Sequence, residues 1–257
     1  MNISSQDNIN FQARLLSQWR CSTLTSKARN ISIIELEKRD VEFAKKFIQH
    51  VKNVQADSKT AREIMDSSSK TILEILQDDD NYSKKIKIFV ATYNETPCGI
   101  FIANMPKTSP NYDGIVYSSR HNLAKNETEL DWLVTWSPKG NERLKGIGKA
   151  LIGEYFRTVK KDKFRDVFVR AEVPEKSFAK SFYEKLGFEQ IGNKRVRLLN
   201  KNSAKSIIND HTEANDETIP MIVTRSRIMQ VAEELATKMN RKEFKSDSLD
   251  AKFLINI

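Results

Sequence analysis

Residues 143–150 read Arg143-Leu144-Lys145-Gly146-Ile147-Gly148-Lys149-Ala150 and are the most informative segment of the sequence. Two glycines one residue apart let a backbone approach a ligand closely. Apolar residues with a four-residue spacing follow and predict an amphipathic helix that begins near Gly146; they are Ile147, Leu151, Tyr155 and Val159. Consecutive N–H groups at a helix start favour anions. The stretch therefore predicts a pyrophosphate cradle, although taken alone it also fits an ordinary turn with solvated basic side chains.

Spacing excludes two other phosphate-binding loops. A dinucleotide-binding fingerprint would need a third glycine where this chain has Leu151. A Walker loop would need Gly-Lys followed by Ser or Thr at a different spacing. The cradle must therefore be of another kind.

Upstream of the cradle, the patterning predicts strand, helix, helix, hairpin and strand. Period-two and period-3.6 apolar spacing identify these elements, and Asp or Ser residues cap the helices. We expect a strand over 31–36, a helix after Asp40, a helix after Asp57 or Ser58, a hairpin over 86–103, a long loop over 105–126 and a strand over 130–136.

Downstream, strands and helices continue to alternate, which implies a sheet with some parallel pairing. We expect a strand over 167–173, a helix opened by Pro174 and ended by Gly187, a polar stretch over 200–218, a strand over 219–224 and a terminal helix with Ile228, Ala232, Leu235 and Met239 on one stripe. The predicted fold class is α/β (α+β), with a mixed central sheet and flanking helices.

The first thirty residues are polar and basic and lack the hydrophobic core of a signal peptide. We expect a disordered leader over 1–30, the main folded domain over 31–225 and a C-terminal helical extension over 226–257. A cytoplasmic location is expected; the basic leader leaves secretion by a specialised bacterial apparatus as the alternative.

Composition limits the partners. The 257 residues include 43 Lys and Arg against 34 Asp and Glu, a net charge of +9, which favours nucleic acid, a membrane surface or a phosphate-bearing small molecule. No apolar run reaches the roughly 18 residues of a membrane helix. Two cysteines and three distant histidines do not form a Cys/His zinc site. We therefore expect no metal and no membrane partner.

A second motif, Ala179-Lys180-Ser181-Phe182-Tyr183-Glu184-Lys185-Leu186-Gly187-Phe188, ends the second helix after the cradle. With Arg-x-x-Gly-x-Gly after a strand, in this order of elements, the chain resembles the GNAT superfamily of acyl-CoA-dependent N-acetyltransferases. The resemblance covers residues 31–224, and its specific motifs lie within 132–188.

The resemblance implies acetyl-CoA as co-substrate and assigns roles to individual residues. Tyr183 would be the general acid near the thioester sulfur. The pantetheine arm would pair with Val134, Thr135 and Trp136, and the pyrophosphate would be wrapped by Arg143, Leu144, Lys145, Gly146, Ile147, Gly148 and Lys149. Lys176 stands where the family often has an asparagine, so it would offer a charge to the cofactor instead of a hydrogen bond.

Amine attack on a thioester also needs a base or a water relay. Glu129, Asp131 and Glu172 are the candidate bases, and their spacing does not separate them from ordinary salt-bridge partners. Tyr183 could equally be a buried helix tyrosine if the motif around it is ignored.

Two functions follow as expectations. The first is an N-acetyltransferase that passes acetyl directly to a primary amine, on a small molecule or a protein, in a ternary complex. The second is a non-catalytic module of the same fold that binds RNA or a protein partner through its basic surface.

Overall fold

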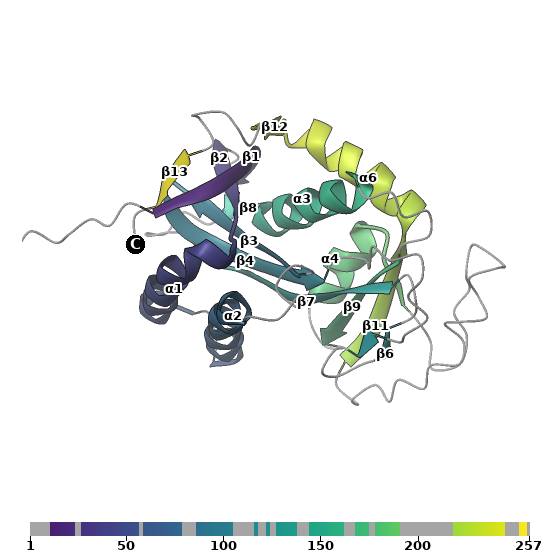
Figure 1. Ribbon diagram of the computed structural model, residues 1–257. Helices are drawn as coiled ribbons and strands as arrows, with labels where there is room; N and C mark the ends of the chain where they lie inside the picture. The colour runs from purple at the N-terminus through teal and green to yellow at the C-terminus, as the bar shows by residue number, and fades with distance from the viewer. Residues whose placement is uncertain are drawn as a thin grey trace, which may run out of the picture. The chain divides into compact units, whose positions relative to one another are not determined.

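Figure 1 shows the computed structural model of the chain. The structure describes residues 11–23, 27–56, 59–78, 86–104, 116–117, 122–123, 127–137, 144–161, 168–174, 178–190, 218–244 and 252–255.

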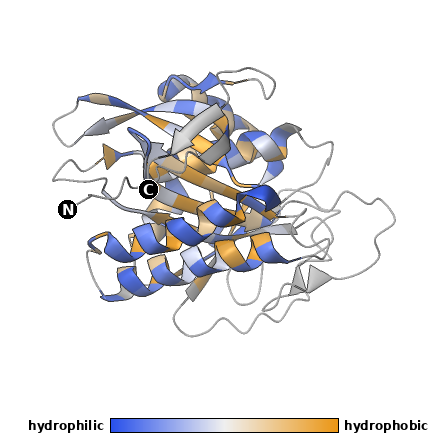
Figure 2. Cartoon of the chain, turned by 60° about the vertical axis from the view of Figure 1, so that its left-hand side comes forward, coloured by the Kyte–Doolittle hydropathy of each residue, from blue (hydrophilic) through white to orange (hydrophobic). Residues whose placement is uncertain are grey.

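Two helices near the N-terminus pack against each other, and hydrophobic and hydrophilic residues alternate in bands along both (Figure 2). They are α1 (Val41–Asn53), which follows the short 3₁₀ helix η1 (Lys38–Asp40) and has Asp40 as its N-cap, and α2 (Lys59–Gln77). Phe43, Phe47 and Val51 of α1 are fully buried, as their four-residue spacing predicts. The side chain of Arg62 on α2 donates to the carbonyl oxygens of Val51, at 2.7 Å, and Val54.

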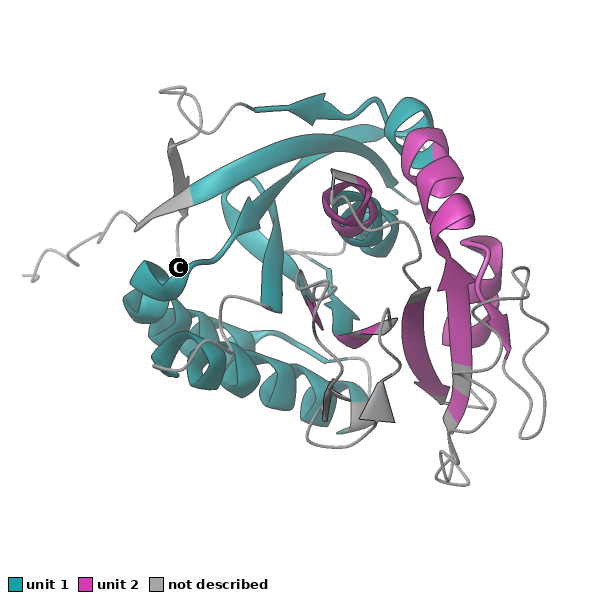
Figure 3. Cartoon of the chain, turned by 45° about the vertical axis from the view of Figure 1, so that its right-hand side comes forward, with its two compact units in different colours: residues 1–102, 132–154, 235–257 teal, residues 103–131, 155–234 magenta. Residues whose placement is uncertain are grey.

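The chain divides into two compact units (Figure 3). Unit 1 consists of residues 1–102, 132–154 and 235–257, and unit 2 of residues 103–131 and 155–234. Strand β7 (Glu127–Thr135) and helix α3 (Ile147–Lys161) contribute residues to both units.

Unit 1 holds an antiparallel arrangement in the strand order β12-β1-β2-β3-β4. The predicted hairpin is present, and its two turn residues, Asn94 and Glu95, have φ values of +46° and +65°, as a tight hairpin turn requires. The strands are β1 (Phe11–Thr23), β2 (Ala28–Glu35), β3 (Ile86–Tyr93), β4 (Thr96–Asn104) and β12 (Lys242–Glu243).

Strand β1 pairs with β2 on one edge and with three short segments on the other. From its start to its end, these are β13 (Lys252–Ile255), β12 and β8 (Leu144–Lys145). The expectation of a disordered leader is therefore wrong for residues 11–23, because these residues form a full-length strand of the sheet with Trp19 completely buried.

The core of unit 1 is built from β2, β3 and β4 together with α1 and α2. Representative members with no exposed side-chain surface are Ile34, Phe47, Ile72, Val90 and Ile100. Burial of these large apolar side chains supplies the main stabilising term for this unit.

Unit 2 has the strand order β7-β9-β11-β10, with β7 and β9 parallel and the other pairs antiparallel. Its further elements are β9 (Phe168–Pro174), β10 (Glu189–Gln190), β11 (Thr218–Thr224), α4 (Ala179–Lys185) and most of α6 (Arg225–Lys238), with a separate ladder of β5 (Val116–Tyr117) and β6 (Asn122–Leu123). Mixed pairing and flanking helices confirm the predicted fold class.

Some local expectations are corrected. Pro174 ends β9 rather than opening a helix, and α4 begins at Ala179, which leaves the ring of Phe178 fully exposed. The predicted terminal stripe is buried at all four positions, three of them on α6 and the fourth, Met239, directly after it. Most of the two predicted loops, 105–126 and 200–218, lies outside the described residues, and the domain boundaries at 30/31 and 225/226 stay predictions.

Candidate functional site

The turn of the predicted cradle leads directly into α3. Gly146 has φ +103°, a conformation that side-chain-bearing residues rarely adopt, and the Ala150 amide donates to the Gly146 carbonyl at 2.9 Å. The first amides of a helix, here those of Ile147, Gly148 and Lys149, have no acceptor within the helix. The local geometry is compatible with the predicted cradle, which stays a prediction, and Arg143 lies outside the described residues.

Unit 1 also provides the support behind this turn. Strand β8 pairs with Ser22 and Thr23 at the end of β1. A Cβ atom on Gly146 would lie 3.2 Å from Cε of Met239 and 3.5 Å from Sγ of Cys21. The φ angle therefore favours glycine here, and a Cβ atom would also press against the end of the Met239 side chain.

The end of β7 carries the residues predicted to meet the pantetheine arm. Its parallel ladder with β9 ends at Leu130, although β7 continues to Thr135. The Trp136 amide donates to the Cys98 carbonyl at 3.0 Å, and its indole N–H donates to the Pro97 carbonyl at 2.9 Å.

The direction of these bonds distinguishes among the three residues. Backbone groups of neighbouring strand residues point to opposite edges of the strand. Trp136 faces β4, and the carbonyl oxygen of Val134 lies beside Gly99 of the same strand. Thr135, between them, therefore directs its N–H and C=O away from β4.

Tyr183 is buried on α4. Its ring makes edge contacts with Phe182 and Phe188, at centroid distances of 5.3 and 5.0 Å. Burial raises the pKa of Tyr183 well above its ordinary value. The phenol is protonated at neutral pH, as it is at its ordinary pKa of about 10, and burial makes it a weaker acid.

The candidate bases have different surroundings. Asp131 is exposed, and both carboxylate oxygens accept from the Asn104 side-chain amide, at 3.4 and 3.3 Å. Glu172 forms an ion pair with the buried Arg170 at 3.1 Å. The side chain of Glu129 and all of Lys176 lie outside the described residues. Asp131 is thus an exposed carboxylate, whereas Glu172 is the partner of a buried arginine.

A hydrogen-bonded group at the end of β4 was not foreseen from the sequence. The Tyr155 hydroxyl donates to the Asn104 carbonyl at 2.8 Å and lies 3.2 Å from Oγ1 of Thr128, which also donates to that carbonyl. The four-residue spacing of α3 placed Tyr155 in the core, but spacing contains no signal for the partner of its hydroxyl. The group anchors Asn104, whose side chain contacts Asp131.

Part of the basic charge after the cradle is neutralised within unit 2. Glu233 accepts from Arg157 at 3.2 Å and from Lys160. The hydrogen bond from Lys160 is the main cause that lowers the pKa of Glu233. These two cations are therefore engaged by α6 rather than presented as an open basic face.

In the part of the chain that the structure describes, no group of three or more His, Cys, Asp and Glu side chains could hold a metal ion. Within the same residues, no helix is long and apolar enough to span a bilayer.

Comparison with solved structures gives similar proteins at low identity. A probable acetyltransferase from Staphylococcus epidermidis has 14% identity and a TM-score of 0.46, covering 76% of this chain and 98% of its own. The ribosomal-protein-S18-alanine N-acetyltransferase from Escherichia coli has 18% identity and a TM-score of 0.41, covering 76% and 93%. The PaiA N-acetyltransferase from Thermoplasma acidophilum, solved with coenzyme A, has 18% identity and a TM-score of 0.43. The match covers 75% of this chain and 97% of that protein.

No curated protein matches the sequence. The assignment therefore depends on the family comparison, in which residues 139–198 match the acetyltransferase (GNAT) domain. This segment contains both the cradle and the Tyr183 motif, on which the predicted resemblance is based. Residues 139–198 of this chain are thus similar to the acetyltransferase domain of the GNAT superfamily.

Proposed function

We propose that this protein is an acetyl-CoA-dependent N-acetyltransferase that passes acetyl directly to a primary amine within a ternary complex. The observation that carries the proposal is the positive φ of Gly146 at the head of α3, inside the segment that matches the acetyltransferase domain. An anion-binding turn at that place fits a pyrophosphate-bearing co-substrate.

The proposal assigns the cofactor to the turn before α3 and to the end of β7. The amides of Ile147, Gly148 and Lys149 would bind the pyrophosphate, aided by Leu144, the exposed Lys145 and Arg143. Lys176 would meet another phosphate. The pantetheine arm would pair mainly with Thr135, whose backbone groups are directed away from β4, between Val134 and Trp136.

Bound acetyl-CoA would supply a thioester carbonyl and a thiol leaving group. The amine nitrogen forms a bond to the carbonyl carbon while the carbon–sulfur bond breaks. Tyr183 donates its proton to the departing sulfur. Asp131 accepts the amine proton directly or through water, with Glu129 as the second candidate. The acceptor is an amine of a small molecule or a protein.

A thermal-shift assay with acetyl-CoA tests the proposal. Ligand at a hundred times its Kd stabilises a folded protein by about 2.7 kcal/mol. This gain should be present in the wild type and absent in Gly146→Asp/Gly148→Asp. Lys59→Glu is the matched control, because it changes the net charge equally at a side chain that is 92% exposed. A wild type without any gain would refute the proposal.

An amine library assayed for free CoA thiol then identifies the acceptor class. No observation favours the non-catalytic alternative over the enzyme, and we therefore do not propose it.

A further inference from the structure

The segment that follows α6, residues 239–244, is hydrogen-bonded along β1. The amide of Arg20 donates to the Met239 carbonyl at 2.7 Å, and the amide of Phe244 donates to the Leu16 carbonyl at 3.0 Å. Between these two bonds, β12 pairs with β1. Backbone bonds thus fix both ends and the middle of the segment to the strand.

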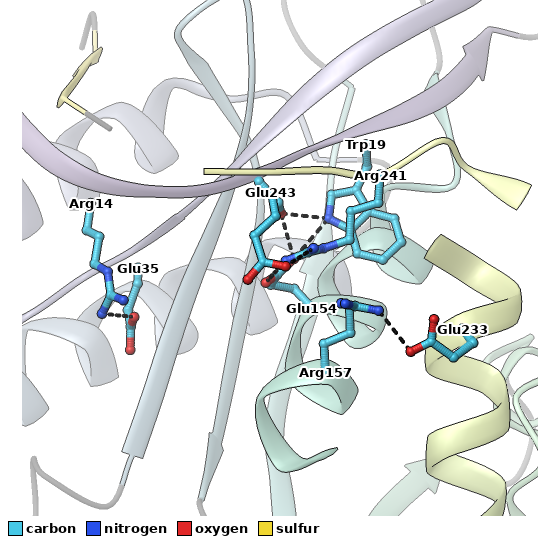
Figure 4. Close-up of polar contacts among 9 residues, drawn as sticks. Arg14, Trp19, Glu35, Glu154, Arg157, Glu233, Arg241 and Glu243 are labelled. Atoms are coloured by element: carbon cyan, nitrogen blue, oxygen red, sulfur yellow. Dashed lines mark hydrogen bonds and ion pairs between the residues drawn. The ribbon is translucent and has the colours of Figure 1, made fainter. Parts of the chain in front are cut away.

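From the middle of this segment, Arg241 reaches α3 and binds both carboxylate oxygens of Glu154. Its Nε lies 2.9 Å from Oε2 and its Nη2 lies 2.8 Å from Oε1 (Figure 4). Oε2 also accepts from Oγ of Ser17, at 2.6 Å, and from the indole N–H of Trp19, at 3.1 Å. The Arg241 and Glu154 side chains are only 4% and 6% exposed. One buried carboxylate therefore joins α3, β1 and the terminal segment.

The same elements line the back of the cradle turn. Met239, two residues before Arg241, and Cys21, two residues after Trp19, are the side chains nearest to a Cβ atom placed on Gly146. A displacement of the terminal segment would therefore change the space directly behind the turn.

We propose that Arg241 is a positioning residue for the cradle: its contact with Glu154 holds Met239 and β1 in place behind Gly146. The inference rests on the proposed function, in which this turn binds the CoA pyrophosphate. The planar guanidinium engages both carboxylate oxygens at once, whereas a lysine ammonium cannot. Arg241→Lys therefore keeps the buried charge and loses the two-point contact.

Hydrogen exchange and donor comparison test the role together in the full-length protein. In Arg241→Lys, we expect amide exchange of residues 144–151 to accelerate about tenfold and CoA affinity to fall about tenfold. Turnover of S-acetylpantetheine, which has no pyrophosphate, should equal that of the wild type. Arg14→Lys is the matched control, because Arg14 also lies on β1 and pairs with a glutamate, Glu35, at 3.2 Å. It should change neither exchange nor affinity.

Unchanged exchange at residues 144–151 together with unchanged CoA affinity would overturn the inference. An equal loss of activity with acetyl-CoA and with S-acetylpantetheine would also overturn the inference, because a general structural defect affects both acetyl donors alike. If Arg241→Lys does not fold, Met239→Ala must show the same loss confined to acetyl-CoA. A wild type that does not bind CoA refutes the proposed function instead, and the exchange measurement then still decides whether Arg241 holds the turn.

Discussion

The indole of Trp19 lies against the backbone of Gly153 so closely that a Cβ atom on residue 153 would come within 2.6 Å of Cη2 of the ring. Strand β1 and helix α3 therefore meet at a contact that only glycine allows. Gly153→Ala should lower the free energy of unfolding by about 1–3 kcal/mol, as overpacking does in a close-packed core. Urea unfolding measures the change.

The sign of this effect is informative. At an open helix position, glycine to alanine stabilises by up to about 1 kcal/mol. A Gly153→Ala protein that is as stable as the wild type would therefore contradict the contact. The double variant Gly153→Ala/Trp19→Leu should recover part of the loss relative to the sum of the single changes, because the two residues touch.

Tyr183→Phe should reduce kcat by about 10²–10⁴-fold and leave the acetyl-CoA Kd unchanged, since it removes a proton donor and keeps the ring. Steady-state kinetics and calorimetry separate the two quantities. Because burial raises the pKa of Tyr183, its deprotonation should not limit the rate below about pH 10. An unchanged kcat would remove Tyr183 from the acid role.

The buried thiols predict a loss of stability in alkali. Burial raises the pKa of Cys21 from 9.0 to about 12 and also raises the pKa of Cys98. The unfolded chain therefore releases these protons first, so stability is full below pH 9 and falls as the pH rises toward 12. Each thiol should contribute about 1 kcal/mol per pH unit in that interval.

Cys21→Ala isolates one of these contributions. Between about pH 9 and 10.5, the free energy of unfolding of this variant should fall less steeply with pH than that of the wild type. The two slopes should differ by the contribution of one thiol, about 1 kcal/mol per pH unit. Equal slopes would show that Cys21 ionises equally in both states. Urea unfolding at several pH values, with reductant present, gives the slopes.

Arg62→Met should destabilise the protein by about 1–3 kcal/mol, because it removes the side-chain donor to the Val54 carbonyl and one of two donors to the Val51 carbonyl. Lys59→Met on the same helix is the control. The Lys59–Glu63 pair spans 3.9 Å between side chains that are 92% and 63% exposed, so its loss should change stability by less than about 0.5 kcal/mol. Similar losses for both variants would contradict the capping role of Arg62.

The elements with a strong apolar period were predictable from the sequence. Helix α3 begins one residue after the predicted glycine, and Gly187, with φ +84°, follows α4 as a helix-ending glycine does. These features depend on neighbouring residues alone, so the local sequence pattern predicts them. The roles of Tyr183 and Asp131 remain predictions.

The sequence pattern did not predict strand β1, because some of its inward-facing residues are polar. Ser17 and Thr23 share the buried face of the strand with Leu15, Trp19 and Cys21, which breaks the apolar alternation. Ser17 is tolerated there because it donates to Glu154, 137 residues away in the sequence. A partner so distant leaves no local signal, and the same holds for Arg241.

The outer edge of β1 also bears on aggregation. An uncovered strand edge is a template for pairing with another chain. Here three short strands, β8, β12 and β13, pair with this edge. All three pairings therefore form only after the chain has been synthesised as far as Ile255. A truncation after Asn240 would remove two of the three covers and expose a hydrogen-bonding edge to other molecules, so the residues after α6 protect the fold against self-association.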